Sequence, residues 1–172
     1  YGDAIAAYDR ALALDPELAS AHCNLGAVRY NRGQRKAAKE AFLRCLELAP
    51  AHLEAHFNLG NIQFQQGEIY AALETWPTAV AIDARHAGAW QGLGNVHYER
   101  RDWTRALAAY RRARGLDRGN ASILFNMAQV HLEQENTDSA IGVLRGALAL
   151  EPRDAEAHFL LGMVYRQSGQ KD

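Results

Sequence analysis

The residues of this chain with the most obvious chemical potential are its histidines. His52 and His56 lie four residues apart. On a helix this spacing places two imidazoles on one face, where they could share a metal ion. The pair belongs to no HExxH pattern, no third ligand is evident near it in sequence, and His56 has counterparts at His22 and His158. The histidines therefore fit a recurring structural position, and we expect neither a metal nor a cofactor.

The sequence holds two cysteines, Cys23 and Cys45. Their spacing matches neither a CxxC metal site nor a redox motif. We therefore expect no disulfide framework, and neither cysteine argues for an oxidising compartment. Cys45 is expected to be a small core residue, because alanine occupies the corresponding place elsewhere in the chain, at Ala11, Ala79, Ala113 and Ala147.

Motifs for phosphate binding or nucleophilic catalysis are missing from the sequence. There is no GxGxxG or GxxxxGK[ST] loop and no GxSxG elbow. Gly92 and Gly94 lie in a helical pattern, not in a strand–turn–helix pattern. The carboxylates are scattered, without a convergent acid–base pair. We predict that this segment is not an enzyme.

The elements that position these residues follow from an internal repeat. The segment 54–67, EAHFNLGNIQFQQG, corresponds at steps of 34 residues to the segments 20–33, 88–101, 122–135 and 156–169. Self-similarity at this fixed period marks a solenoid, and 34 residues is the tetratricopeptide spacing. Helical segments account for every stretch, so nothing remains to build a sheet or a second domain.

The whole chain resembles the tetratricopeptide repeat (TPR) family, because several positions recur together: Leu-Gly in the first helix, a small-aromatic-small series in the second, and a closing proline. The resemblance implies an all-α fold, a right-handed α-solenoid of antiparallel helix pairs. We divide the single domain 1–172 into a second helix of a truncated repeat at 1–18, repeats at 19–52, 53–86, 87–120 and 121–154, and a terminal first helix at 155–172.

Glycine recurs inside the expected first helices, at Gly26, Gly60, Gly94 and Gly162, with Ala128 in the remaining copy. An isolated glycine inside a helix costs roughly 1 kcal/mol against alanine. Its recurrence therefore predicts close approach of two helices, where a bulkier side chain would not fit.

Several residues are expected to shape the helix ends. Asp102, Asn120 and Thr137 are suited to cap the helices that follow them. Pro77 lies inside the second helix of the repeat 53–86, where proline removes a backbone hydrogen bond and clashes with the preceding turn. We predict a kink or an early break near residues 73–77.

Charge and hydropathy exclude some classes of partner. The formal net charge is -1, so no global field draws the chain to nucleic acid or acidic lipid. Basic residues gather at 29–39 and 111–114, which we expect to be solvated helix faces. No apolar run reaches the roughly 18 residues of a membrane span, and no signal peptide is evident. The chain opens within a repeat, so its compartment stays open, with the cytoplasm as the default.

One broad arc of each first helix is a candidate binding surface. At about 100° per residue, the arc gathers carboxamides beside aromatic rings. In the family this arc lines the concave groove, so the resemblance implies a peptide-binding role for its members. The predicted groove residues are Asn24, Tyr30, Phe57, Asn58, Asn61, Phe64, Asn95, Tyr98, Phe125, Asn126 and Gln129.

Two interpretations of these residues stay open. Carboxamides offer a donor and an acceptor to the backbone of an extended peptide, and aromatics supply apolar area. The pattern resembles the asparagine ladder of O-linked N-acetylglucosamine transferases, interrupted here at Gly92 and Leu160. Alternatively, the asparagines reflect a family preference and the aromatics pack against neighbouring helices. The Lys/Asn/Arg series with which some family members clamp acidic chaperone tails is missing.

We therefore expect a non-catalytic scaffold that binds a protein or peptide segment in the groove, with no nucleic-acid partner. Two alternatives remain. The terminal helices are complementary halves of a repeat, so copies could associate head to tail. The segment could also be the substrate-recognition arm of a larger enzyme such as a glycosyltransferase.

Overall fold

A computed structural model describes residues 1–169 of the chain. These residues form ten α-helices and no β-strand, which confirms the all-α prediction. The helices are α1 (Gly2–Leu14), α2 (Ala19–Asn31), α3 (Arg35–Leu48), α4 (Leu53–Gln65), α5 (Ile69–Ile82), α6 (Ala87–Glu99), α7 (Trp103–Leu116), α8 (Ala121–Glu133), α9 (Thr137–Leu150) and α10 (Ala155–Ser168). Within this part of the chain, no helix is both long and apolar enough to cross a bilayer.

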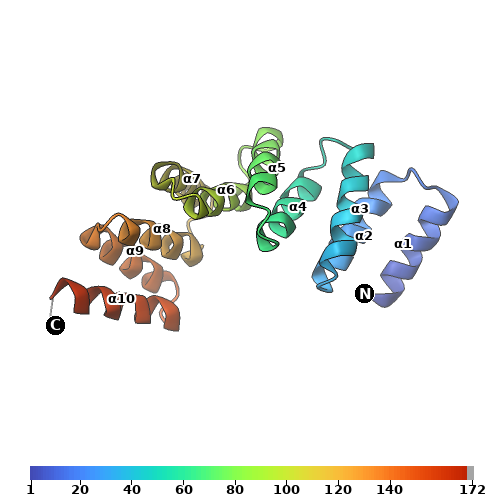
Figure 1. Cartoon of the computed structure of the whole chain (residues 1–172). Helices are drawn as coiled ribbons and strands as arrows, with labels where there is room; N and C mark the ends of the chain where they lie inside the picture. Colours follow the sequence, from blue (N-terminus) through green and yellow to red (C-terminus); the bar gives the residue numbers. More distant parts are fainter. Residues whose placement is uncertain (170–172) are drawn as a thin grey trace. The chain divides into compact units, whose positions relative to one another are not determined.

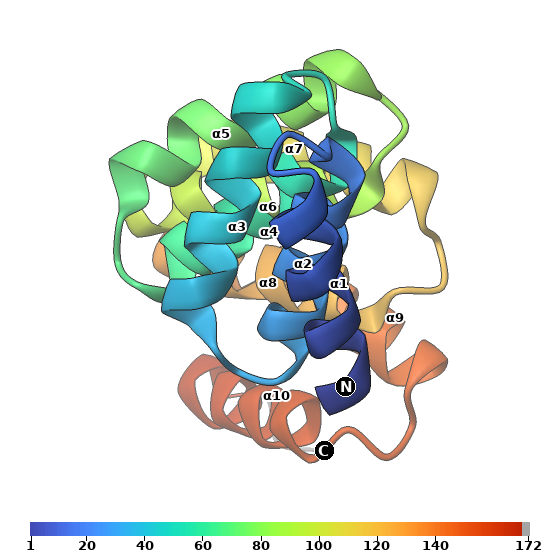
Figure 2. The ribbon, with the colours of Figure 1, turned by 90° about the vertical axis from the view of Figure 1, so that its right-hand side faces the viewer.

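The helices fall into two compact units, Tyr1–Ala84 and Arg85–Asp172, called here the first and second unit. In the first unit, α2 packs on α3 and α4 on α5 as antiparallel pairs, and α1 lies against α2 (Figures 1 and 2). In the second unit, α6 pairs with α7 and α8 with α9, and α10 packs on α9 (Figure 1). Each unit is thus a short TPR solenoid, as the repeat period predicted.

Close contact between a glycine and an aromatic ring explains how three of the pairs pack. A Cβ atom placed on the glycine would lie far inside van der Waals distance of the ring. The separations would be 2.7 Å for Gly26 and Phe42, 2.6 Å for Gly60 and Trp76, and 2.3 Å for Gly94 and Tyr110. The predicted close approach is confirmed at these three sites and is wrong at Gly162, where an added Cβ atom would meet nothing within 4 Å among the described residues.

The α8–α9 pair achieves the same close packing with different residues. Ala128 stands where the other pairs have glycine, and Leu144 stands where they have an aromatic ring. Both residues are completely buried in one apolar cluster. A larger first residue is therefore matched by a smaller second one, so the pair of positions conserves its combined volume.

Side chains cap six of the ten described helices, and two of the three predicted caps are confirmed. Asp102 accepts a hydrogen bond from the Arg105 backbone N–H at 3.1 Å, and Asn120 caps α8. The prediction for Thr137 is wrong, because Asn136 caps α9 and Thr137 is the first helical residue. Both carry a side-chain oxygen, and the sequence pattern does not distinguish neighbouring candidates.

The turn within each pair requires a left-handed residue. Gly33 and Gly67 supply it with φ values of 74° and 76°. Arg101 and Glu135 adopt the same region, with φ values of 57° and 56°. Arginine and glutamate therefore preserve the turn in place of glycine, at a local conformational cost of about 1 kcal/mol each.

Pro77 lies inside α5, which runs without interruption from Ile69 to Ile82. The predicted early break is therefore wrong, and the kink stays a prediction. The hydroxyl of Thr78 donates to the Glu74 carbonyl at 3.3 Å, one turn earlier. The buried Trp76 and Ala79 also hold the helix against the core on either side of the proline.

Candidate functional site

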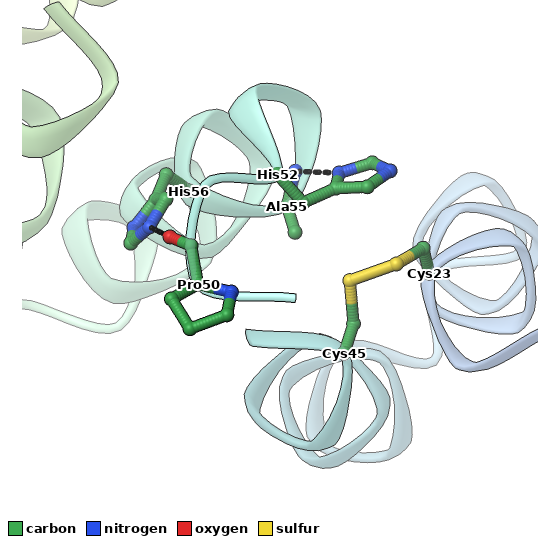
Figure 3. The surroundings of a disulfide bond; sticks show 6 residues. All are labelled: Cys23, Cys45, Pro50, His52, Ala55 and His56. Atoms are coloured by element: carbon green, nitrogen blue, oxygen red, sulfur yellow. Dashed lines mark hydrogen bonds between the residues drawn. A yellow bond between two sulfur atoms is a disulfide. The ribbon is translucent and has the colours of Figure 1, made fainter. Parts of the chain in front are cut away.

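Cys23 on α2 and Cys45 on α3 are joined by a disulfide bond, with their Cα atoms 5.0 Å apart (Figure 3). The expectation of no disulfide is therefore wrong, although Cys45 is fully buried as predicted. The residues are separated by 22 positions, which matches no short motif. Only the folding of α2 against α3 brings them together, so spacing alone could not reveal the bond.

The histidines that could have suggested a metal site have structural roles. His52 caps α4 by accepting the Ala55 backbone N–H at its Nδ1 atom, 3.2 Å away (Figure 3). His56 Nε2 lies 2.8 Å from the Pro50 carbonyl, and His22 and His158 make the corresponding contact with the proline six residues before them. These contacts support the interpretation of a recurring structural position.

Cys23, Cys45 and His52 nevertheless place one sulfur, a second sulfur and a ring nitrogen within 4.8 Å of one another. The sulfurs are bonded to each other, and the His52 Nδ1 lone pair receives the Ala55 N–H. Metal coordination requires thiolates and a free imidazole lone pair. These donor groups are therefore engaged in holding α2, α3 and the start of α4.

The predicted aromatics of the first unit pack against their neighbours. The Phe64 ring lies 5.8 Å from that of Trp76, between centroids. Arg35 lies over the Tyr30 ring at 5.4 Å, and the Tyr30 hydroxyl receives a hydrogen bond of 3.4 Å from Gln65. Phe57 is half-buried on α4. For Tyr30 and Phe64 these contacts favour the interpretation as packing residues.

The predicted groove carboxamides of the first unit, in contrast to the aromatics that pack against their neighbours, make no side-chain hydrogen bond within the described part of the chain. Asn58 and Asn61 on α4 are half-buried, and Asn24 on α2 is exposed. Among residues 1–169, none of these three side chains has a hydrogen-bond partner. A half-buried carboxamide with unused donors and acceptors can bind a peptide backbone at little desolvation cost.

In the second unit, two predicted groove residues bind each other. The Asn95 Oδ1 atom accepts a hydrogen bond of 2.8 Å from the Tyr110 hydroxyl and one of 3.2 Å from Asn126 Nδ2. Tyr110 is buried, and burial raises the pKa of its hydroxyl well above the ordinary value. The Tyr98 and Trp103 rings are tilted and 5.4 Å apart. Asn95 thus supports the core of this unit.

We expect Asn95→Ala and Asn61→Ala to change stability by different amounts, although the two residues occupy the same repeat position, 34 residues apart. Asn95→Ala leaves the buried Tyr110 hydroxyl without its acceptor and should lower the free energy of unfolding by about 1–2 kcal/mol. Asn61→Ala removes no internal hydrogen bond and should change it by less than about 0.5 kcal/mol. Urea denaturation followed by circular dichroism measures both, and equal losses would contradict the assignment.

A cavity of about 360 Å³ lies between α8 and α10. Phe125 and Gln129 line it from α8, and Glu156, Phe159 and Leu160 line it from α10. The Phe159 side chain is 70% exposed, and the Gln129 carboxamide has no hydrogen-bond partner among residues 1–169. The cavity therefore combines apolar walls with a free carboxamide and a carboxylate, as a site for an amphipathic segment would.

Two of the predicted groove residues, Phe125 and Gln129, are thus brought together at one cavity. The α10 residues were missed as a site, although the sequence held a signal. Phe159 and Leu160 stand 34 positions after Phe125 and Asn126. Only the structure shows that the Phe159 ring is exposed at the cavity instead of buried.

Two further histidines also recur at 34 positions, His97 and His131. Burial lowers the pKa of both imidazoles, and their Nδ1 atoms are buried without a hydrogen-bond partner. His97 lies 4.0 Å from the Asp102 carboxylate, which partly offsets the effect of burial. Desolvated, neutral imidazoles at a repeated position are typical of packing residues.

Comparisons with known proteins agree with this architecture. A family model described as "TPR repeat" matches residues 1–33, and models described as "Tetratricopeptide repeat" match residues 23–79 and 125–172, and residues 97–145. None of the curated proteins matches the chain.

Solved structures share the fold at low sequence identity. MamA superposes with a TM-score of 0.81 at 24% identity, over 88% of this chain and 89% of that one. YrrB, described as a TPR protein with an unusual peptide-binding site, has a TM-score of 0.81 at 24% identity, over 91% and 80%. The APC/C hetero-tetramer Cut9–Hcn1 matches with a TM-score of 0.79 at 21% identity, over 97% of this chain and 34% of that one. With its repeat period, its helix pairs and the matched models, the chain belongs to the tetratricopeptide repeat family.

Proposed function

We propose that the chain is a non-catalytic scaffold that binds a segment of another protein along the exposed faces of its first helices. The TPR is a general protein-interaction fold, and we take the carboxamide-bearing arc of the first helices to be its binding surface here. The observation that carries the proposal is the cavity between α8 and α10, where exposed Phe159 and unpartnered Gln129 meet.

The side chains of this cavity specify the chemistry of the ligand. Phe125, Phe159 and Leu160 supply apolar walls for an aliphatic or aromatic side chain. Gln129 can donate to a backbone carbonyl and accept from a backbone N–H of the same segment. The Glu156 carboxylate favours a Lys or Arg beside the apolar residue. We therefore expect the preferred segment to carry an apolar anchor next to a basic residue.

The first unit has free carboxamides of its own, which we propose as a second binding surface within that unit. Asn58 and Asn61 lie on one helix, and neither side chain is used internally within residues 1–169. These carboxamides can donate to and accept from the backbone of a ligand, whatever the sequence of that ligand. Asn95 is expected to contribute less to ligand binding, because its Oδ1 atom already accepts two hydrogen bonds.

Peptides selected from a random display library against the chain provide the test. Phe159→Ala with Gln129→Ala should weaken their binding by about tenfold or more, because the apolar anchor and the backbone contact are both lost. Leu116→Ala on α7 is the matched control, since Leu116 is also an exposed apolar side chain, 40% accessible, and does not line the cavity. Equal affinity of the double variant and the wild type would refute the proposal.

Self-association is the second candidate, and exposed apolar residues on the terminal helices favour it. Leu14 on α1 is 84% exposed, and Phe159 and Met163 on α10 are 70% and 43% exposed. Copies could cover these faces by joining head to tail. Light scattering across a range of concentrations separates the candidates, because a scaffold stays monomeric and a head-to-tail assembly grows with concentration. The third alternative, a substrate-recognition arm of a larger enzyme, uses the same groove.

A further inference from the structure

A second cavity, of about 720 Å³, lies in the first unit and is lined by residues of α1, α2, α3 and the turn between α2 and α3. Its lining includes four cationic side chains, Arg29, Arg32, Arg35 and Lys36, and one carboxylate, Glu40. This group of four cations is called here the basic cluster. It shares no lining residue with the cavity between α8 and α10, and that cavity belongs to the second unit.

The internal contacts of the basic cluster leave part of its charge unused. Arg29 lies 3.4 Å from the Asp9 carboxylate, and Arg35 lies over the Tyr30 ring. Arg32 and Lys36 are exposed, and neither side chain has an ion pair or hydrogen bond within residues 1–169. The four cations thus outnumber two carboxylates, Glu40 in the lining and Asp9 paired with Arg29, and the cluster keeps a net positive charge.

The fold itself does not require these cations. Among the residues 34, 68 and 102 positions after the basic cluster, Arg100 is the one arginine or lysine. The full set is Gln63, Gln66, Ile69, Tyr70, His97, Arg100, Trp103, Thr104, His131, Gln134, Thr137 and Asp138. Helix pairs therefore form at these places with mostly neutral side chains. Arg35 and Lys36 also lie in the first turn of α3, which has no acidic residue. Cations at that end of a helix reduce its stability, so their presence points to a role in binding.

We propose that the basic cluster is a docking site for an acidic peptide segment of a partner protein. Guanidinium groups bind carboxylates through paired hydrogen bonds, and Lys36 adds a mobile point charge. Ile5 and Ala37 add apolar side chains to the lining of the cavity. A short segment with several Asp or Glu residues fits this combination of charge and size.

Nucleic acid is disfavoured as the occupant. A phosphate backbone requires a basic surface that continues along the strand. Here Glu40 lines the same cavity, Asp9 borders it, and the whole chain has a formal net charge of -1. The cavity therefore mixes cations with carboxylates, and this mixture suits a few carboxylates of a peptide better than a continuous polyanion.

The test uses the whole chain and a fluorescein-labelled peptide rich in glutamate, with fluorescence anisotropy at low salt. The test variant is Arg32→Gln with Lys36→Thr, which introduces the residue types found at Gln66 and Thr104. Because the other repeats fold with these residues, the variant should keep its helical circular dichroism, and Arg32→Gln alone is a milder second variant. We expect the double variant to bind the peptide about tenfold more weakly.

The control variant, Arg111→Gln with Arg112→Gln, removes the same amount of charge from exposed positions on α7. We expect it to bind like the wild type, and we expect the glutamine version of the peptide to show no binding. An equal loss of affinity in both variants would show that only the net charge matters, and this would overturn the proposal. So would unchanged affinity in the test variant, or tighter binding to oligouridylate or to phosphatidylserine vesicles than to the peptide. These outcomes are independent of the groove, whose residues stay unaltered.

Discussion

Removing the disulfide is expected to lower the free energy of unfolding of the first unit by about 3 kcal/mol. The bond closes a loop of 22 residues between α2 and α3, so it restricts the unfolded chain. A domain of this size is marginally stable, and about 3 kcal/mol is a large share of its stability. The effect should therefore appear as a clear fall in the urea midpoint when a dithiol reductant is added.

The variant Cys23→Ala with Cys45→Ala separates the loss of the bond from other effects of the reductant. Alanine is the natural residue at the place of Cys45 in the other repeats, at Ala79, Ala113 and Ala147, all of them buried. The variant should match the reduced wild type and show no response to reductant. Two alkylatable thiols in the non-reduced wild type, or an unchanged midpoint, would contradict the presence of a stabilising bond.

Gly94→Ala is expected to destabilise the second unit by about 1–3 kcal/mol, the usual range for overpacking. Its Cβ atom would lie 2.3 Å from the Tyr110 ring, which is buried and hydrogen-bonded to Asn95 and so cannot move aside easily. Alanine has the better helix propensity. A loss of stability would therefore come from packing alone.

The double variant Gly94→Ala with Tyr110→Leu tests the physical reason, because it copies the natural pair Ala128 and Leu144. Tyr110→Leu alone should cost about 2 kcal/mol through a cavity and a lost hydrogen bond. In the double variant the added methyl group enters the space left by the ring. We expect its loss to be smaller than the sum of the single losses, by about 1 kcal/mol. Additive losses in urea denaturation would show that the two positions do not share one volume.

The repeated helix pairs were predictable because they depend on local patterns that recur. Glycine at a 34-residue spacing indicated close helix contact, and the contacts of Gly26, Gly60 and Gly94 with aromatic rings confirm it. The type of each secondary-structure element and the repeat length are set by short-range hydrophobic periodicity. Because the same pattern recurs several times in this chain, the signal is unusually clear. The all-α fold and the family followed from this signal.

Long-range features were harder to predict. Cys23 and Cys45 gave no short motif, and only the helix pair brings them within bonding distance. Asn95 looked like any other carboxamide of the arc, but its neighbour 15 positions on is Tyr110, whose hydroxyl uses it. Whether a polar side chain is free or engaged depends on which residue lies opposite, and helical periodicity does not contain that information.

The central claim is that the free carboxamides and exposed rings of the first helices receive a protein segment. Nuclear magnetic resonance titration of the isotopically labelled chain with a library-selected peptide tests it most directly. We predict that the side-chain amide signals of Gln129 and the ring signals of Phe159 shift in proportion to bound peptide, while the backbone amide signals of α7 stay in place. Shifts confined to α7 and α9, with the Gln129 and Phe159 signals unchanged, would contradict the account.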